Sequence, residues 1–249
     1  MAVRFPAHPV ARRLIELCGF PLAAPSANSS GNPSPTAAHH VLQDLIGKIP
    51  LIVDGGACWS GIESTVVDVM RVPLVILRPG GVTLEQIRQV LPSVQVYNKD
   101  FVGSKEMEEK PSTPGMKYRH YSPRAKVLLF EGADYGKVRK ALGEELARCN
   151  AEGVKYGLVQ THRESIYPEF TPGVTEEELN MGIPPINVFC QLGFEERLDE
   201  VAQGLFRMLR SMDDDGVQVI LIEGVSEERE GLAVMNRLRK AASKVVVLD

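Results

Sequence analysis

Residues 217–248 read VQVILIEGVSEEREGLAVMNRLRKAASKVVVL, and this stretch decides the fold class. Apolar residues form a nearly unbroken run over 217–223, recur at helical spacing over 229–242, and form a second run over 244–248. A strand, a helix and a second strand in this order make a β-α-β unit, whose two strands lie parallel in one sheet. The stretch therefore predicts an α/β fold with a mostly parallel sheet.

The same alternation extends back toward residue 125. We expect strands at 127–130, 156–160 and 187–190 and helices at 135–149 and 194–212. Regular alternation of strands and helices is typical of doubly wound sheets that are covered by helices on both faces. The sequence thus predicts a Rossmann-like, doubly wound α/β domain over residues 125–249.

A second α/β pattern covers residues 1–97. The expected strands are 2–5, 20–24, 51–54, 64–70 and 74–77, and the expected helices are 9–18, 36–46 and 83–91. Thr83 and Gln86 have the spacing of a capping box at the start of the last helix. Between the two patterns, residues 98–124 lack apolar periodicity and are rich in charge, glycine and proline, which predicts a linker.

The composition narrows the class of protein. The chain has 249 residues, of which 44% are apolar, enough for two globular domains. Its net charge of -4 argues against a general binder of polyanions, so any anion site would have to be local. Four widely spaced cysteines, no long apolar run and no secretory leader at the start predict a cytoplasmic protein with reduced thiols and no membrane partner.

Several enzyme classes lose support because their motifs are absent from the sequence. It contains no nucleophile elbow, no P-loop, no HExxH zinc motif and no GxGxxG fingerprint. His39 and His40 are adjacent, so on a helix they would point about 100° apart and would not chelate one metal ion. We expect no metal site beyond the Mg²⁺ that a nucleotide would bring.

The loop over residues 24–36, APSANSSGNPSPT, is the most unusual segment of the chain. It follows an expected strand, precedes an expected helix, and contains no charge and no large apolar side chain. Its small side chains let backbone N–H groups approach an anion, and the helix N-terminus beyond adds a favourable dipole. The alternative is an ordinary surface loop, because Ser, Asn, Gly and Pro also make up such loops.

Residues 78–83, RPGGVT, form a second strand-to-helix corner, in which Arg78 can bind a phosphate through two N–H groups. Two such corners support an anion site better than one, because the carboxyl ends of parallel strands face one crevice. The alternative is a turn with a solvated arginine. Nearby, Ser64 and Thr65 point to opposite faces of a strand, so only one can face a site. Arg4 is either an edge charge or an anchor for a carboxylate.

Taken in order, these segments resemble a YrdC-like domain, and the following linker and second domain resemble the two-domain form of the L-threonylcarbamoyladenylate synthase family. The segments are 3–6 (VRFP), 24–31 (APSANSSG), 54–56 (DGG), 63–68 (ESTVVD), 76–81 (ILRPGG) and 114–123 (PGMKYRHYSP). The resemblance implies a partial YrdC-like twisted α/β domain over 1–97, a linker over 98–124, and the Rossmann-like domain. It also explains two aromatic rings and several basic side chains in a segment that otherwise reads as a spacer.

The resemblance implies an activity as well: nucleotidyl transfer that joins ATP, L-threonine and bicarbonate into threonylcarbamoyl-AMP and pyrophosphate. ATP is then a substrate that carries Mg²⁺, and the product passes to a tRNA-modifying threonylcarbamoyl transferase. By motif, ATP would be bound by Ser26, Asn28, Ser34, Arg78 and Tyr121, and threonine by Arg4, the Ala24 backbone and Ser64. No side chain is expected to act as a nucleophile, because the threonine carbamate itself attacks the α-phosphate.

The start of the sequence departs from the family pattern. In the family a long stretch with Lys and Arg residues precedes the VRFP segment, whereas here that segment begins at residue 3. We therefore expect this chain to be N-terminally truncated and poorly active, with an unpaired sheet edge and exposed apolar surface over residues 1–97. Two alternatives stay open. One is a non-catalytic module that binds nucleotide or double-stranded RNA, with RNA contacts from Lys117, Arg119 and Arg124. The other is the carbamoyltransferase context of YrdC-like domains, against which the linker and terminal domain weigh.

Overall fold

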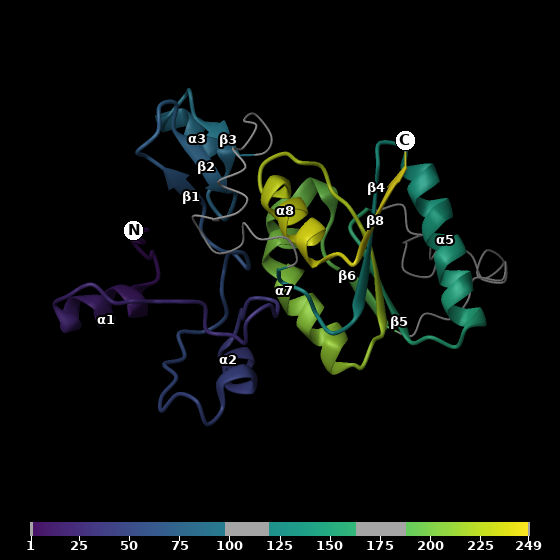
Figure 1. The fold of residues 1–249 in the computed structure, drawn as a ribbon, viewed down its shortest axis with the longest axis horizontal. Helices are drawn as coiled ribbons and strands as arrows, with labels where there is room; N and C mark the ends of the chain where they lie inside the picture. Colours follow the sequence, from purple (N-terminus) through teal and green to yellow (C-terminus); the bar gives the residue numbers. More distant parts are fainter. Residues whose placement is uncertain (1, 98–119, 163–187, 249) are drawn as a thin grey trace.

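The computed structural model describes residues 2–97, 120–162 and 188–248. Within them the strands form two sheets, one of three strands in the order β1-β2-β3 and one of five in the order β6-β5-β7-β4-β8. Figure 1 shows the small sheet together with α1 and α2 on one side of the molecule, and the large sheet with α5, α7 and α8 on the other. The chain is thus an α/β protein, as the sequence predicts.

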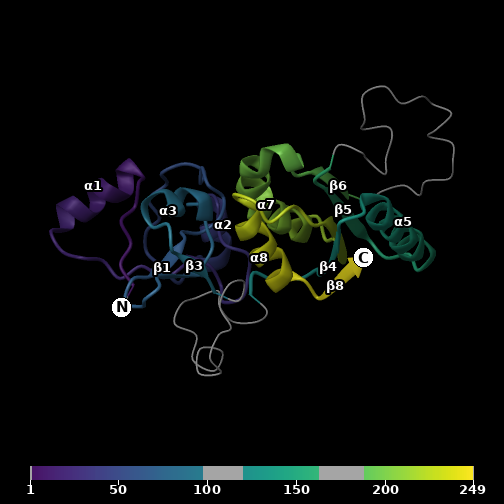
Figure 2. The same ribbon diagram turned by 90° about the horizontal axis from the view of Figure 1, so that it is seen from above.

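The large sheet is parallel throughout, and helices cover both of its faces. Its strands are β4 (Lys126–Gly132), β5 (Tyr156–Gln160), β6 (Val188–Gln191), β7 (Val219–Glu223) and β8 (Lys244–Leu248). Helix α5 (Tyr135–Ala151) covers one face, and α7 (Leu198–Asp214) and α8 (Gly231–Ala241) cover the other, as Figure 2 shows from above. A short 3-10 turn, Glu195–Arg197, precedes α7. The predicted doubly wound arrangement is confirmed.

The apolar core explains why the central strands carry unbroken apolar runs. Ile220, Leu221 and Ile222 of β7 are completely buried, with alternate side chains packed into the clusters on the two faces. On the α5 face they meet residues such as Leu142 and Tyr156, and on the other face residues such as Phe206. Burial on both faces requires apolar residues at every position, which is the pattern that the sequence shows.

The small sheet belongs to residues 2–97, which we call the N-terminal segment. Its strands are β1 (Val66–Asp68), β2 (Val75–Arg78) and β3 (Gln95–Val96), and its helices are α1 (Pro9–Cys18), α2 (Ala38–Leu45) and α3 (Leu84–Val90). Strand β2 pairs antiparallel with β1 and parallel with β3. The predicted capping box at the start of α3 is present: the Thr83 hydroxyl accepts from the Gln86 backbone N–H, and the Gln86 side chain accepts from the Thr83 backbone N–H.

Three expected strands, at 2–5, 20–24 and 51–54, are wrong. These residues are not helical, but the structure assigns them to no strand, because a strand needs a hydrogen-bonded neighbour and no described strand lies beside them. Their side chains also lack the packing that favours strand residues: Phe5 is 85% exposed and Leu51 is 74% exposed. Local alternation of apolar and polar residues could not reveal the missing partner.

Apolar exposure is concentrated in the N-terminal segment. Among the described residues, all the large apolar side chains that are exposed lie before residue 98, apart from Val245 and Val247 of β8. They include Phe5, Phe20 and Trp59. The expected exposed apolar surface over residues 1–97 is therefore found. No helix in the described ranges is both long and apolar enough to cross a membrane.

Two buried arginines join the N-terminal segment to the helices of the large sheet. Arg210 of α7 donates to the Pro33 carbonyl at 3.1 Å and to the Asp44 carboxylate at 2.8 Å. Arg237 of α8 forms an ion pair of 2.9 Å with Glu63. Because α7 and α8 pack on the large sheet with one side and on residues 2–97 with the other, they fix how the two parts meet.

Candidate functional site

The predicted corner after β2 is folded tightly onto the residues that lead into β1. A Cβ at Gly80 would lie 2.3 Å from the Glu63 carbonyl oxygen and 2.4 Å from the Thr65 amide nitrogen, so only glycine allows this approach. The Gly81 amide donates to the Glu63 carbonyl at 3.0 Å, and Arg78 Nη2 donates to the Ser64 carbonyl at 2.9 Å. The two motifs, far apart in sequence, therefore form one structural element.

The Glu63 carboxylate is the centre of the site. One oxygen accepts from the Ser34 hydroxyl at 2.7 Å, and the other accepts from Arg237 Nε at 3.0 Å and Nη2 at 2.9 Å. Burial opposes ionisation of this carboxyl, but the charge of Arg237 and the hydrogen bond from Ser34 outweigh it and hold the Glu63 pKa below its usual value. The side chain is thus a carboxylate at neutral pH.

Arg237 connects this carboxylate to the neighbouring corner. The side chain is 0% exposed and also donates through Nη1 to the Pro79 carbonyl. Its guanidinium lies 5.8 Å from the centre of the Tyr121 ring, within reach of a cation-π contact. A buried guanidinium is tolerated only with such partners, because its desolvation is otherwise costly.

Tyr121 brings the end of the predicted linker into the same cluster. Its ring is 1% exposed and packs on Phe206 of α7 at a centroid distance of 5.2 Å. The next residue, Ser122, donates its amide to the Gly31 carbonyl at 2.8 Å, which ties the linker to the loop over residues 24–36. The Tyr121 hydroxyl is buried without a hydrogen-bond partner among the described residues, and burial raises its pKa.

Further titratable groups surround this cluster. The backbone amide of His120 donates to the Lys240 carbonyl at 3.2 Å, and its buried Nδ1 has no partner in the described part of the chain. Burial, followed by repulsion from Arg237 and Arg78, lowers the pKa of Lys240 to about 8. Burial also lowers the pKa of His120. Three basic side chains, Arg78, Arg237 and Lys240, therefore lie near the Glu63 carboxylate in the described part of the chain.

The structure brings together part of the predicted site. Ser34, Ser64, Arg78 and Tyr121 belong to the cluster described above. Asn28 holds its own loop, since its side-chain amide donates to the carbonyls of Ser29 and Asn32, while its buried Oδ1 lacks a partner among the described residues.

Three other predicted residues lie apart. Arg4, Ala24 and Ser26 are exposed, and in the described ranges no hydrogen bond or ion pair joins them to the cluster. The assignment of all eight residues to ATP and threonine stays a prediction.

Sequence reasoning missed the two residues that α8 contributes, Arg237 and Lys240. A signal for Arg237 was available, because it lies four residues after Ala233 and four before Ala241, on the stripe of the helix that is buried. A charge on an apolar stripe indicates a buried partner. That the partner would be Glu63, 174 residues away in sequence, could not be read from local pattern.

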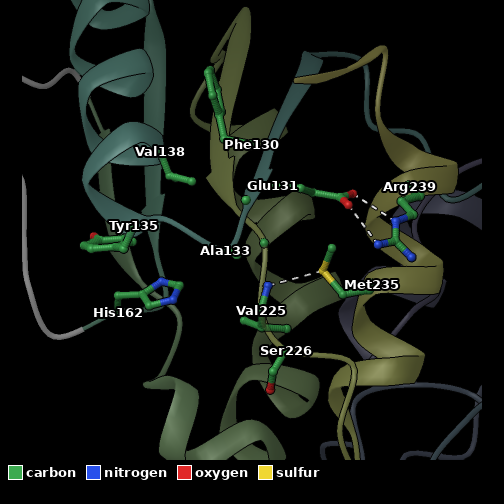
Figure 3. A pocket seen from close by; sticks show the side chains of 12 residues that line it. Phe130, Glu131, Ala133, Tyr135, Val138, His162, Val225, Ser226, Met235 and Arg239 are labelled. Atoms are coloured by element: carbon green, nitrogen blue, oxygen red, sulfur yellow. Dashed lines mark hydrogen bonds and ion pairs between the residues drawn. The ribbon is translucent and has the colours of Figure 1, made fainter. Parts of the chain in front are cut away.

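A separate pocket of about 410 Å³ lies at the carboxyl ends of β4 and β7. The chain leaves these adjacent strands toward opposite faces of the sheet, through α5 and α8, which is where doubly wound folds open a crevice. Figure 3 shows Tyr135 and His162 on one side of the pocket, with Met235 and the Glu131–Arg239 pair on the other. Tyr135, which lines the pocket, donates its hydroxyl to the fully buried Glu223 at 2.8 Å.

The fold and the cluster define a class: an α/β protein in which a doubly wound sheet and a smaller α/β segment meet at a largely buried polar site with several basic side chains. Two family models match the chain. That of the C-terminal domain of threonylcarbamoyl-AMP synthase matches residues 82–243, and the one described as telomere recombination (Sua5, YciO, YrdC) matches residues 1–80. The chain belongs to the threonylcarbamoyl-AMP synthase (Sua5) family.

Curated relatives and a solved structure agree with this family. The chain is 49% identical to the threonylcarbamoyl-AMP synthase of Schizosaccharomyces pombe, with 98% of this chain and 57% of the relative covered. It is 44% identical to the enzyme of Pyrococcus abyssi (99% and 65% covered) and 39% identical to that of Bacillus subtilis (99% and 64% covered). It resembles the crystal structure of P. abyssi Sua5 complexed with L-threonine with a TM-score of 0.78 and 42% identity, covering 99% of this chain and 65% of that one.

The chain covers only part of the length of each relative, which limits what can be transferred from them. The chain spans about three fifths of the length of these three curated relatives, from 57 to 65%. The expectation of an N-terminal truncation and the domain boundaries at 97 and 125 stay predictions. The activity of the relatives is therefore proposed, not stated, for this chain.

Proposed function

We propose that the chain acts as an L-threonylcarbamoyladenylate synthase, which converts ATP, L-threonine and bicarbonate into threonylcarbamoyl-AMP and pyrophosphate. The observation that carries the proposal is the cluster around Glu63, in which Ser34, Arg78 and the linker's Tyr121 lie together. Family membership supports it, and so does the P. abyssi relative, whose crystal structure is described as a complex with L-threonine.

The reaction requires the protein to position the reactants and to stabilise negative charge. It does not require a nucleophilic side chain. An oxygen of the threonine carbamate attacks the α-phosphorus of ATP, and the bond from that phosphorus to the bridging oxygen breaks. Pyrophosphate leaves with the electron pair. Positive side chains such as Arg78 stabilise the charge that builds up on the phosphate oxygens, and the enclosed site excludes water that would compete with the carbamate.

Magnesium would enter this site on the nucleotide. The carboxylate of the cluster, Glu63, already accepts from Ser34 and Arg237, so the side chains gathered there do not themselves form a divalent-cation site. We therefore assign the charge neutralisation on the protein's side to its arginine and lysine residues. Transfer of the product to a tRNA-modifying threonylcarbamoyl transferase stays a prediction from the family resemblance. Contact with RNA and a cytoplasmic location stay predictions from the sequence.

The proposal is tested by incubating the purified chain with ATP, L-threonine and ¹⁴C-bicarbonate. We expect pyrophosphate release and a labelled nucleotide product, both dependent on threonine, with the full-length P. abyssi relative as a positive control. Pyrophosphate release that does not depend on threonine and bicarbonate would contradict the proposal. So would the failure of the chain to bind either ATP or L-threonine in calorimetry.

A further inference from the structure

The pocket at the carboxyl ends of β4 and β7 lies outside the cluster around Glu63. None of the eight residues assigned to ATP and threonine is among its described lining residues. Its volume of about 410 Å³ falls within the range of about 300 to 1,000 Å³ that is typical of small-molecule sites. Doubly wound sheets bind their ligands at such a place, where adjacent strands are left toward opposite faces. The pocket thus has the size and the position of a second ligand site.

A buried carboxylate that the proposed reaction does not use fixes one wall of this pocket. Glu223, at the end of β7, accepts from the Tyr135 hydroxyl at the start of α5. It also accepts from the backbone amides of Thr161 at 2.8 Å and His162 at 3.2 Å, which follow β5. The rings of Tyr135 and His162 are stacked at a centroid distance of 4.4 Å. This wall is therefore formed before a ligand arrives, which lowers the entropic cost of binding.

The opposite side of the pocket offers carboxylate oxygens. Arg239 of α8 donates to the Glu131 carboxylate through Nε at 2.9 Å and Nη2 at 2.8 Å, and through Nη1 to Glu227. A carboxylate has about four lone-pair positions, so Glu131 can accept from the hydroxyl groups of a ligand in addition to Arg239. Two carboxylates already pair with this guanidinium, which makes it a poor partner for a further anion.

The usual place for a phosphate in such a sheet is occupied by a carboxylate. Doubly wound folds hold phosphates at the N-terminus of the helix that follows a strand, by its free backbone N–H groups. At the N-terminus of α5 the Asp134 side chain accepts from the amides of Gly136 at 2.9 Å and Lys137 at 3.3 Å. The negative charge of Asp134 would repel a phosphate, and the sequence lacks the GxGxxG fingerprint. The pocket therefore favours an uncharged ligand.

The remaining surface of the pocket suits a planar apolar group with an acceptor on its edge. Val138, Val225 and Met235 line it together with the aromatic ring of Tyr135. The Val225 amide donates to the Met235 thioether at 3.3 Å, the contact dashed in Figure 3. A thioether is a weak acceptor on a flexible side chain, so an oxygen or ring nitrogen of a ligand can replace it.

We propose that this pocket binds a nucleoside, at a site separate from that of the ATP in the proposed reaction. A nucleoside combines a planar base, which has acceptors on its edge, with vicinal hydroxyl groups, and it carries no charge. The base packs between Tyr135 and Met235 and accepts from the Val225 amide, while the ribose hydroxyls donate to Glu131. A nucleoside monophosphate is disfavoured, because its phosphate would meet the carboxylates of Asp134 and Glu131.

The first experiment measures the binding of adenosine and, separately, of uridine to the full chain by calorimetry. Excess ATP is present and threonine is left out, so that a nucleotide site elsewhere is occupied and nothing is turned over. The variant Ala133→Trp fills the pocket from an exposed position of its lining. The matched control is Ala147→Trp, which places the same side chain on an exposed position of α5 outside the described lining.

We expect the wild type to bind at least one nucleoside in the presence of ATP, and Ala133→Trp to bind it about tenfold more weakly or less. Ala147→Trp should behave as the wild type, and all three proteins should bind ATP equally well. The nucleoside that binds identifies the base. If neither nucleoside binds, or if Ala133→Trp binds as tightly as the wild type, the proposal is wrong, whatever the outcome for the synthase activity.

A second experiment tests the ribose contact and the exclusion of phosphate, under the same conditions. The 2′,3′-dideoxy form of the bound nucleoside should bind the wild type about tenfold more weakly, the loss typical of a hydrogen bond to a charged group. Glu131→Gln should weaken the nucleoside but not its dideoxy form, whereas Glu145→Gln, whose carboxylate pairs with Arg148 on α5, should weaken neither.

The 5′-monophosphate should bind about tenfold more weakly than the nucleoside. Equal or tighter binding of the monophosphate would overturn the assignment of an uncharged ligand. An equal loss for the nucleoside and its dideoxy form in Glu131→Gln would overturn the contact with the ribose. Cooperative thermal unfolding confirms that each variant is folded.

Discussion

The guanidinium of Arg237 and the carboxylate of Glu63 meet at 2.9 Å across the boundary between α8 and the N-terminal segment. Arg237 is wholly buried, so this is a structural ion pair rather than a surface contact. The pair draws the residues that precede β1 toward the helix that follows β7. It therefore links the stability of the interface to the geometry of the candidate site.

Loss of this pair should be costly. We expect Arg237→Met to lower the free energy of unfolding by about 3 kcal/mol or more, because it leaves the Glu63 carboxylate in a buried place without its cation. Urea denaturation measures the change. The exposed pair between Arg239 and Glu131 provides the matched control, since Arg239→Met should cost less than about 1 kcal/mol. Equal losses in the two variants would show that the buried pair contributes no more to the free energy of unfolding than the exposed pair.

The tight corner at Gly80 should not accept a side chain. In Gly80→Ala the new Cβ would overlap the Glu63 carbonyl, so the corner must move, and we expect both lower stability and weaker ATP binding. Gly143, within α5, has no atom within 4 Å of the place of its Cβ, so Gly143→Ala should instead stabilise the protein by about 0.5 to 1 kcal/mol. Thermal unfolding of both variants tests the contrast.

Tyr121→Phe should lower the affinity for ATP without lowering the stability of the protein. The hydroxyl that it removes is buried and has no partner among the described residues, so its loss should leave the unfolding temperature unchanged or raise it slightly. If the hydroxyl binds the nucleotide, as the family resemblance implies, the affinity for ATP should fall several-fold in the same variant. A clear loss of stability would contradict the first expectation, and an unchanged affinity would contradict the second.

His40 of α2 should make stability depend on pH. The Thr36 amide donates to His40 Nδ1 at 3.1 Å, which requires a neutral ring at that atom. Burial, with repulsion from His39 and Arg210, lowers the pKa of His40 from 6.5 to about 4. The folded pKa lies below the unfolded one, so the contribution is fully present above pH 6.5. It is lost progressively as the pH falls toward 4.

Denaturation at a series of pH values from 7 to 4 measures this dependence. His40→Gln cannot ionise, so its free energy of unfolding should fall less steeply over the same interval. A variant that keeps the wild-type slope would assign the pH dependence to other groups, such as the buried carboxylates.

The parts of the fold that local pattern determines were predictable. Helix α1 and strands β5 and β8 have the predicted bounds, because their periodicity, the Gly19 that ends α1 and the flanking turns are encoded within each segment. The wrong strands at 2–5, 20–24 and 51–54 have suitable local sequences too. What they lack is a neighbour to pair with, and pairing depends on residues distant in the chain.

The candidate site shows the same limit. The corner at Arg78 and the aromatic residue at Tyr121 could be singled out from residue types and spacing. The pairing of Arg237 with Glu63 could not, because the two residues are 174 positions apart in the sequence. Sequence reasoning finds the groups that a site needs more readily than the distant elements that hold them in place.

Helix α8 contributes side chains both to the pocket at the edge of the large sheet and to the cluster around Glu63. Met235 and Arg239 border the 410 Å³ pocket at the edge of the large sheet, while Arg237 and Lys240 face the cluster around Glu63. These four side chains lie within two turns of the helix. A molecule held in the pocket and a ligand held at the cluster would therefore rest against the same short piece of backbone.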